Sequence, residues 1–146
     1  MQRLTLRVAI VMAAFLLLGQ DARAELFSKA YAFKPDTTLQ VGVEIPGGLR
    51  LDTVEFVLPK EGSQAGTFTG PKVKVSISNL GTTPVKIGVA IAVTDAEGRL
   101  VAVASGGTKL FPLRTDRQII YTLAIDNVHA ELSSGSVFRI SIEPTP

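Results

Sequence analysis

The chain has 146 residues, a formal net charge of +2 at pH 7 and no cysteine, which excludes disulfides, thiol chemistry and cysteine-ligated zinc. Three of its 15 basic residues and one of its 13 acidic residues lie in residues 1–24, so the remainder carries 12 of each and has no net charge. No run of lysine or arginine occurs in that remainder. We therefore expect no nucleic acid as a partner and find no electrostatic case for acidic membranes.

Residues 1–24 are predicted to be a signal peptide. Two arginines precede an unbroken apolar run from Val8 to Gly19, and Ala22-Arg23-Ala24 supplies the small-x-small pattern that a signal peptidase recognises. The apolar run is too short to cross a bilayer, which takes about 20 residues. Glu25 follows the expected cleavage point, where a lipoprotein would have cysteine. The sequence thus predicts an exported protein, periplasmic or secreted, with no stable membrane span after signal removal.

The rest of the chain is predicted to be an N-terminal arm, residues 25–38, followed by one domain, residues 39–146. Apolar and polar residues alternate with period two through most of that domain, which is the pattern of half-buried strands. The fold class that follows is all-β, an antiparallel two-sheet sandwich of about seven strands, with a closed barrel as the alternative. The predicted strands cover residues 39–45, 49–58, 72–78, 85–94, 99–104, 118–126 and 136–143.

One hairpin is specific enough for its register to be predicted. Asp95-Ala96-Glu97-Gly98 fits a type I turn followed by a left-handed glycine. This turn places Asp95 opposite Arg99. It then sets Val93 opposite Val101 and Ile91 opposite Val103, with all four branched side chains toward the core.

The other face of this hairpin is then made of small residues, where a solvent-facing surface would carry lysine, glutamate and threonine. We hypothesise that a partner covers this face, or that residues 25–38 do so with Leu26, Phe27, Tyr31 and Phe33. The alternative is an ordinary exposed face, since scattered exposed apolar residues are common. The small residues concerned are Gly88, Ala90, Ala92, Ala102 and Ala104.

A family resemblance emerges between Lys72 and Arg117. A strand ends in Asn79-Leu80-Gly81, a long strand runs into Thr94-Asp95-Ala96-Glu97-Gly98, and the turn Arg114–Arg117 precedes another strand. This order resembles the fibronectin type III-like and immunoglobulin-like sandwiches of bacterial envelope proteins, including the FxLYD group. The aromatic residue expected before Asp95 is absent, as is a Pro-Gly pair in the turn. The resemblance implies such a sandwich with a binding or assembly role, and it transfers no functional residue.

His129 is the only histidine and the first candidate for metal or acid–base chemistry. Its neighbours Asp126, Asn127 and Glu131 offer oxygen ligands, but a zinc site usually draws on several histidines or cysteines. We therefore expect His129 to be a surface or locally hydrogen-bonded residue, and we expect neither a metal site nor a cofactor.

The acidic residues and serines do not form a recognisable catalytic pattern either. Asp52 and Glu55 have odd spacing and so face opposite sides of a strand, whereas Asp95 and Glu97 share a tight turn. No Gly-x-Ser-x-Gly elbow is present. The sequence predicts that the protein is not an enzyme.

Two further features are candidates for binding. Arg114 and Arg117, with Lys109, form a basic cluster that suits a carboxylate-bearing partner, unless Asp116 already neutralises it in a solvated loop. Outer strands of a sandwich also expose backbone groups to which a partner strand can add.

The prediction is therefore an exported, non-catalytic module of the cell envelope that acts either in protein binding or in an assembly or chaperone-like role. It binds another envelope protein or its own copies. The alternative is a small-ligand or carbohydrate-binding module, for which the chain offers no tryptophan and only Tyr31 and Tyr121. An enzyme ranks third.

Overall fold

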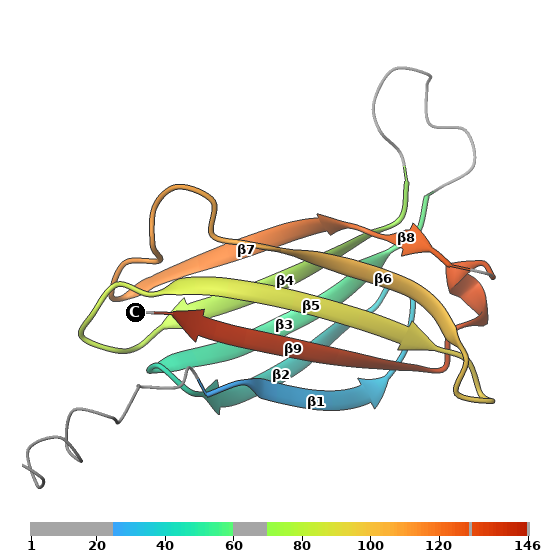
Figure 1. Ribbon diagram of the computed structural model, residues 1–146, viewed down its shortest axis with the longest axis horizontal. Coiled ribbons are helices and arrows are strands. Elements are labelled where there is room, and N and C mark those ends of the chain that lie inside the picture. Colours follow the sequence, from blue (N-terminus) through green and yellow to red (C-terminus); the bar gives the residue numbers. More distant parts are fainter. Residues whose placement is uncertain (1–24, 60–69, 129, 146) are drawn as a thin grey trace, which may run out of the picture.

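The computed structural model describes residues 25–59, 70–128 and 130–145, which form a β-sandwich of two facing sheets (Figure 1). Neighbouring strands within each sheet are antiparallel. The elements are β1 (Phe27–Ala32), β2 (Thr38–Ile45), β3 (Leu49–Val57), β4 (Lys72–Asn79), β5 (Lys86–Thr94), β6 (Leu100–Gly107), β7 (Arg117–Ala124), β8 (Asp126–Asn127), a 3-10 turn η1 (Leu132–Ser134) and β9 (Val137–Thr145).

The larger sheet has the strand order β1-β9-β5-β6-β8, and the smaller sheet has the order β2-β3-β4-β7. The predicted two-sheet sandwich is confirmed, and the closed barrel does not form. All seven predicted strands are present as β2 to β7 and β9. The structure adds β1 and the two-residue strand β8 at the two edges of the larger sheet.

The core lies between the sheets, where the period-two alternation places one apolar side chain of every pair. Strand β5 shows this most clearly, because Ile87, Val89, Ile91 and Val93 are buried while the residues between them are not. Burying a branched side chain of this size stabilises the fold by about 1.5–3 kcal/mol. Strands β4 and β9 contribute in the same way, with Val73, Val75, Ile77, Phe138, Ile140 and Ile142 almost inaccessible.

Residues 25–38 join the sandwich and do not lie over the alanine face as hypothesised. Strand β1 pairs with β9, with Phe27 opposite Ile142 and Tyr31 opposite Phe138. Tyr31 stacks on Phe138 with ring centroids 5.5 Å apart. Phe33 is buried edge-on against Phe56 at 4.8 Å. The aromatic residues of this segment therefore face the protein's own interior, as their apolar character favours.

The β5–β6 hairpin has the predicted turn but not the predicted register. Asp95 N–H bonds to the Arg99 carbonyl at 3.0 Å, and Gly98 has a φ of 80°, as expected. Beyond the turn, however, Thr94 lies opposite Leu100 and Val93 lies opposite Ala102. Val101 is an extra residue, a β-bulge, and a one-residue shift turns every later side chain to the other face.

Because of this bulge, two residues predicted to lie on the surface lie in the core instead. Ala102 and Ala104 lie opposite Val93 and Ile91, and both are buried in the core. Val103, predicted to be a core residue, instead lies opposite Ala92 on the outer face and is half-buried.

Candidate functional site: the outer face of the larger sheet

Two adjacent rows of side chains cross the outer face of the larger sheet, one of alanine and serine only and one that mixes alanine with valine and charged residues. The strand register aligns residues of β1, β9, β5, β6 and β8 side by side. The first row is Ser28, Ser141, Ala90 and Ser105, and the second is Ala30, Arg139, Ala92, Val103 and Asp126.

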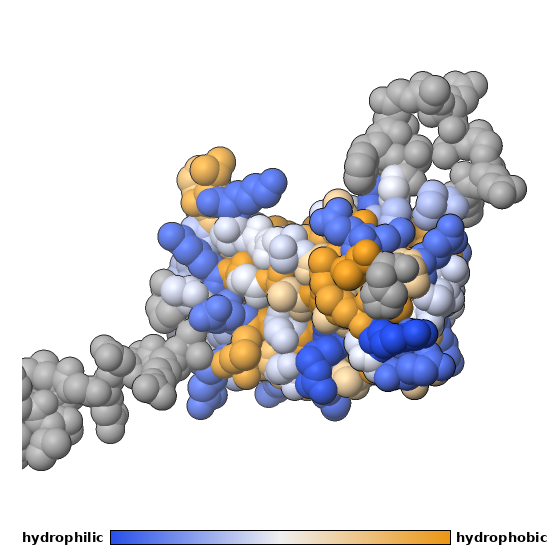
Figure 2. Space-filling model, turned by 45° about the vertical axis from the view of Figure 1, so that its right-hand side comes forward, coloured by the Kyte–Doolittle hydropathy of each residue, from blue (hydrophilic) through white to orange (hydrophobic). Residues whose placement is uncertain are grey.

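The parts of these rows on β9, β5, β6 and β8 line a shallow hollow of about 310 Å³, whereas Ser28 and Ala30 of β1 lie outside its lining. Ala90, Ala92 and Val103 line its middle, while Arg139 and Asp126 belong to its lining from β9 and β8. Figure 2 views this side of the molecule obliquely and shows pale and orange atoms of weakly polar and apolar residues between strongly hydrophilic side chains. The floor consists of short side chains, so another molecule can approach the sheet backbone closely here.

Three of the five small residues predicted for this surface lie on it, namely Gly88, Ala90 and Ala92. Sequence reasoning missed Ser28, Ser105, Arg139 and Ser141, which complete the rows. No local pattern indicates them, because they come together only through the pairing of β1 with β9 and of β9 with β5.

Arg139 is the only cation in the two rows. Within the described residues its guanidinium forms no ion pair, and its one side-chain hydrogen bond is a long one of 3.5 Å to Ser28 Oγ. Asp126 lies three strands away in the same row, at about 14 Å for a strand spacing of about 4.8 Å. The hollow thus has a positive and a negative end.

Arg114 and Arg117 lie at one end of the sandwich, outside these rows. Both are exposed, and neither forms an ion pair with Asp116 in the part of the chain that the structure describes. Arg114 lies in the connection between β6 and β7 and Arg117 begins β7, so both follow the exposed side chains of Leu110 and Phe111. The adjacent pair Leu110-Phe111 was a readable signal, since two large apolar residues rarely occupy a turn.

A second cavity, of about 220 Å³, opens between the two sheets beside β1 and β2. Its apolar walls include Leu39, Phe56 and Phe138, and Lys34 and Gln40 are among its polar lining residues. The hydroxyl of Tyr31, another lining residue, is buried and has no hydrogen-bond partner among the described residues. Burial also raises the pKa of Tyr31 above its ordinary value.

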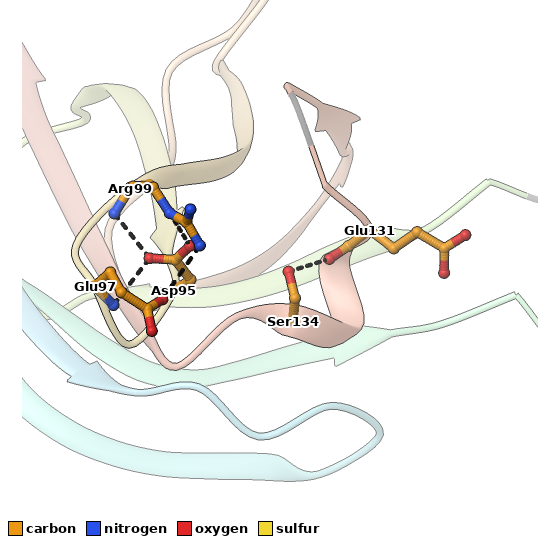
Figure 3. A network of polar contacts seen from close by, with 5 residues as sticks. All are labelled: Asp95, Glu97, Arg99, Glu131 and Ser134. Carbon is orange, nitrogen blue, oxygen red and sulfur yellow. Dashed lines mark hydrogen bonds and ion pairs between the residues drawn. The ribbon is translucent and has the colours of Figure 1, made fainter.

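The acidic pair at the β5–β6 turn is structural (Figure 3). Asp95 Oδ1 accepts hydrogen bonds from the backbone N–H groups of Glu97 and Arg99, at 3.0 and 2.9 Å, and its Oδ2 pairs with Arg99 Nε at 2.8 Å. Burial alone would raise the pKa of Asp95, but these hydrogen bonds and the charge of Arg99 lower it below its ordinary value. This carboxylate stays ionised and fully engaged with its own turn.

Asp52 is engaged on the outer face of the smaller sheet. Its carboxylate accepts hydrogen bonds from Arg50 and Ser78, both at 2.6 Å, and from Gln118 at 3.0 Å. Burial opposes the charge of Asp52, yet these three donors and the positive charge of Arg50 lower its pKa. Glu55 pairs with Lys74 at 3.4 Å. Both acids lie on this outer face, because a β-bulge at Asp52 shifts the alternation of β3, so the expectation that they face opposite sides was wrong.

Residues 1–24 and His129 lie outside the described residues. In the described ranges, no group of three or more histidine, cysteine, aspartate or glutamate side chains is arranged to hold a metal ion. No helix there has the length and apolar character needed to cross a membrane.

Comparison with known proteins adds no assignment. No protein-family model matches the chain, and neither the curated proteins nor the solved structures give a significant match. The resemblance to envelope sandwiches therefore remains a prediction.

Proposed function

We propose that the protein is an exported, non-catalytic binding module of the cell envelope that docks another polypeptide on the outer face of its larger sheet. The observation that supports this most directly is the continuous floor of small side chains across β1, β9, β5 and β6. Solvent-facing sheets normally carry long polar side chains, and a floor of alanine and serine suits close contact with another backbone.

The charges at the hollow indicate what such a partner carries. Arg139 has unused donors that suit a carboxylate, because a guanidinium binds two carboxylate oxygens at once. Asp126, at the other end of the row, suits a cation. The partner segment we propose therefore has an acidic and a basic residue about three strand spacings, or about 14 Å, apart.

In-cell photocrosslinking tests this proposal. A photoreactive residue replaces Ala92 on the proposed surface, and in a matched control it replaces Thr122, an exposed residue of β7 in the other sheet. We expect an adduct from position 92 only, abolished by adding Arg139→Glu. An adduct with a second copy of the chain would identify self-association.

The proposal fails if position 92 gives no adduct, or gives one that survives Arg139→Glu. Ala92→Lys, with Thr122→Lys as its control, provides an independent readout. We expect both variants to keep the parent melting temperature, because both sites accommodate a lysine at the surface, but only Ala92→Lys to lose association.

A small-ligand module is the second candidate, and the cavity beside β1 and β2 favours it. An apolar chamber with a buried, unpaired Tyr31 hydroxyl suits a small amphipathic ligand with a hydrogen-bond acceptor. A thermal-shift panel of short carboxylic acids and phenols tests it, since a ligand that binds only the folded state raises the melting temperature. We expect any positive shift to shrink in Tyr31→Phe. The carbohydrate form is less favoured, because Tyr121 is buried and Tyr31 is stacked on Phe138.

A further inference from the structure

The first part of the connection between β6 and β7, residues 108–113, forms a loop that projects from one end of the sandwich (Figure 1). Leu110 is 82% exposed and Phe111 is 83% exposed, more than any other large hydrophobic side chain in the described ranges. Figure 2 shows an apolar tip at this place with hydrophilic atoms directly beside it. Exposing two adjacent large apolar side chains to water is unfavourable in free energy. A loop that only connected two strands would avoid this cost by carrying polar residues.

Both ends of this loop are fixed to the body of the protein. Thr108 N–H donates to the Ile87 carbonyl at 2.9 Å, and its hydroxyl accepts from Ile87 N–H at 3.1 Å. At the other end, Leu113 is buried and exchanges two backbone hydrogen bonds with Val85, at 3.0 and 2.8 Å. The tip between these two anchors projects from the sandwich, and its two apolar side chains stay exposed.

Cations surround the base of the loop. Lys109 and Arg114 flank the tip in sequence, Arg117 begins β7, and Lys86 lies between the two residues that anchor the loop. All four are exposed, and residues 108–117 contain Asp116 as their only acid. The chain beyond residue 24 has no net charge, so this end of the sandwich concentrates positive charge that the composition hides.

We propose that the 108–113 loop docks the protein on an anionic lipid bilayer. Leu110 and Phe111 enter the interfacial region, while Lys86, Lys109, Arg114 and Arg117 lie over acidic head groups. A fluid bilayer accommodates a convex tip without a preformed pocket. Because acidic head groups extend in all directions around an inserted tip, they can pair with cations on both sides of it. The residues of this site are separate from those lining the hollow on the larger sheet, so the two proposals can fail independently.

A single-tryptophan reporter tests this docking, because the chain contains no tryptophan. The protein beginning at residue 25, which contains every described strand, is prepared with Phe111→Trp. Vesicles of phosphatidylcholine mixed with phosphatidylglycerol are compared with vesicles of phosphatidylcholine alone. We expect a blue shift of the emission with the anionic vesicles. We also expect the shift to be lost between about 0.01 M and about 1 M salt, as the Debye length falls from about 30 Å to about 3 Å.

Vesicle sedimentation of variants with the native Phe111 separates the two contributions. Leu110→Ser with Phe111→Ser is expected to lower the partition coefficient about tenfold or more. Lys109→Gln with Arg114→Gln should lower it about 25-fold, at about fivefold per cation. Val128→Ser is the matched control, because Val128 is 51% exposed beyond β8, at the other end of the sandwich, and it should bind like the parent.

Two results would overturn the docking proposal. One is an unshifted tryptophan at millimolar anionic lipid with the protein left in the supernatant. The other is equal sedimentation of the parent and the double serine variant. In-cell crosslinking distinguishes a protein partner from a bilayer. If the parent forms a crosslinked protein adduct that the double serine variant loses, and the parent does not bind vesicles, the tip binds a protein and docking on a bilayer is excluded.

Discussion

The side-chain amide of Asn79 donates a hydrogen bond of 3.0 Å to the carbonyl of Leu113, which ties the end of β4 to the far anchor of the 108–113 loop. The same amide donates to the Thr83 carbonyl at 2.9 Å, and its oxygen accepts from Gly81 N–H at 2.9 Å. Asn79 is completely buried. One side chain therefore holds two loops at the end of the sandwich that carries the cations.

Replacing Asn79 should lower stability substantially. Asn79→Ala is expected to lower the free energy of unfolding by about 3 kcal/mol, because it removes three hydrogen bonds and leaves a cavity at a completely buried position. The Leu113 carbonyl keeps its hydrogen bond from Val85 N–H. Asn79→Asp should be worse at pH 7, since a carboxylate cannot donate to two carbonyls. Urea denaturation at pH 7 measures both. An effect below about 1 kcal/mol would mean that the loops are held by other contacts.

The corrected register of β6 gives a second prediction. Ala102→Lys should destabilise the protein by about 3 kcal/mol or more, because Ala102 is fully buried and a lysine there buries a charge. Ala90→Lys, on the exposed face of β5, should change stability by less than about 0.5 kcal/mol. Thermal melts of the two variants distinguish the registers. Equal tolerance at both positions would favour the unbulged hairpin.

Two glycines with positive φ angles should respond differently to alanine. Gly98 has a φ of 80° and open space around it, so Gly98→Ala should cost about 1–2 kcal/mol of backbone strain alone. At Gly107 an added methyl would collide with the Ile87 carbonyl oxygen, so Gly107→Ala should cost more and should disturb the neighbouring loop anchor. Chemical denaturation of both variants provides the comparison, and the reverse ranking would contradict the packing of β6 against β5.

Tyr31→Phe should leave the protein as stable as the parent or stabilise it by about 1 kcal/mol. The Tyr31 hydroxyl is buried without a partner, and removing such a group relieves its desolvation cost. The melting temperature in the absence of added ligand is the measurement. A clear loss of stability would indicate that water or another group satisfies this hydroxyl.

Acid should destabilise the protein through Asp52 and Asp95. Their pKa values are lower in the folded protein than in the unfolded chain, where an aspartate titrates near about 3.9. As the pH falls below about 4, these two aspartates therefore bind protons in the unfolded chain before they do so in the folded protein. The stabilisation that they provide above that pH is lost as the pH falls through their pKa values in the folded protein. Urea midpoints between about pH 6 and about pH 2 should fall, with a smaller fall in Asp52→Asn and in Asp95→Asn.

Local pattern was enough to predict much of this fold. Period-two alternation located seven strands, and the Asp95 to Gly98 turn formed as its residues indicate. The register beyond the turn was predicted wrongly, because the alternation of valine and alanine in residues 101–104 favours the valines inside, whereas the bulge at Val101 turns Ala102 and Ala104 toward the core. The extra strand β1 was missed for the same kind of reason, since its partner β9 is distant in sequence.

The candidate surfaces were predictable only in part. Ala90 and Ala92 share a strand, so their common face is readable from spacing. Arg139 joins them through pairing between β9 and β5, and Lys86 joins Lys109 through the anchor of the 108–113 loop. Contacts of this kind follow from the completed topology. The signal peptide, the export and the binding role stay predictions.

The pairing of β1 with β9 imposes an order on folding. Strand β9 separates β1 from β5 in the larger sheet, so β1 has no place to add until β9 has been synthesised. Its partners lie more than one hundred residues away, and closing so long a loop slows folding. A nascent chain is thus kept from completing the sandwich before its final strand is made. Such a delay is compatible with the predicted export, which would require the chain to cross the membrane before it folds.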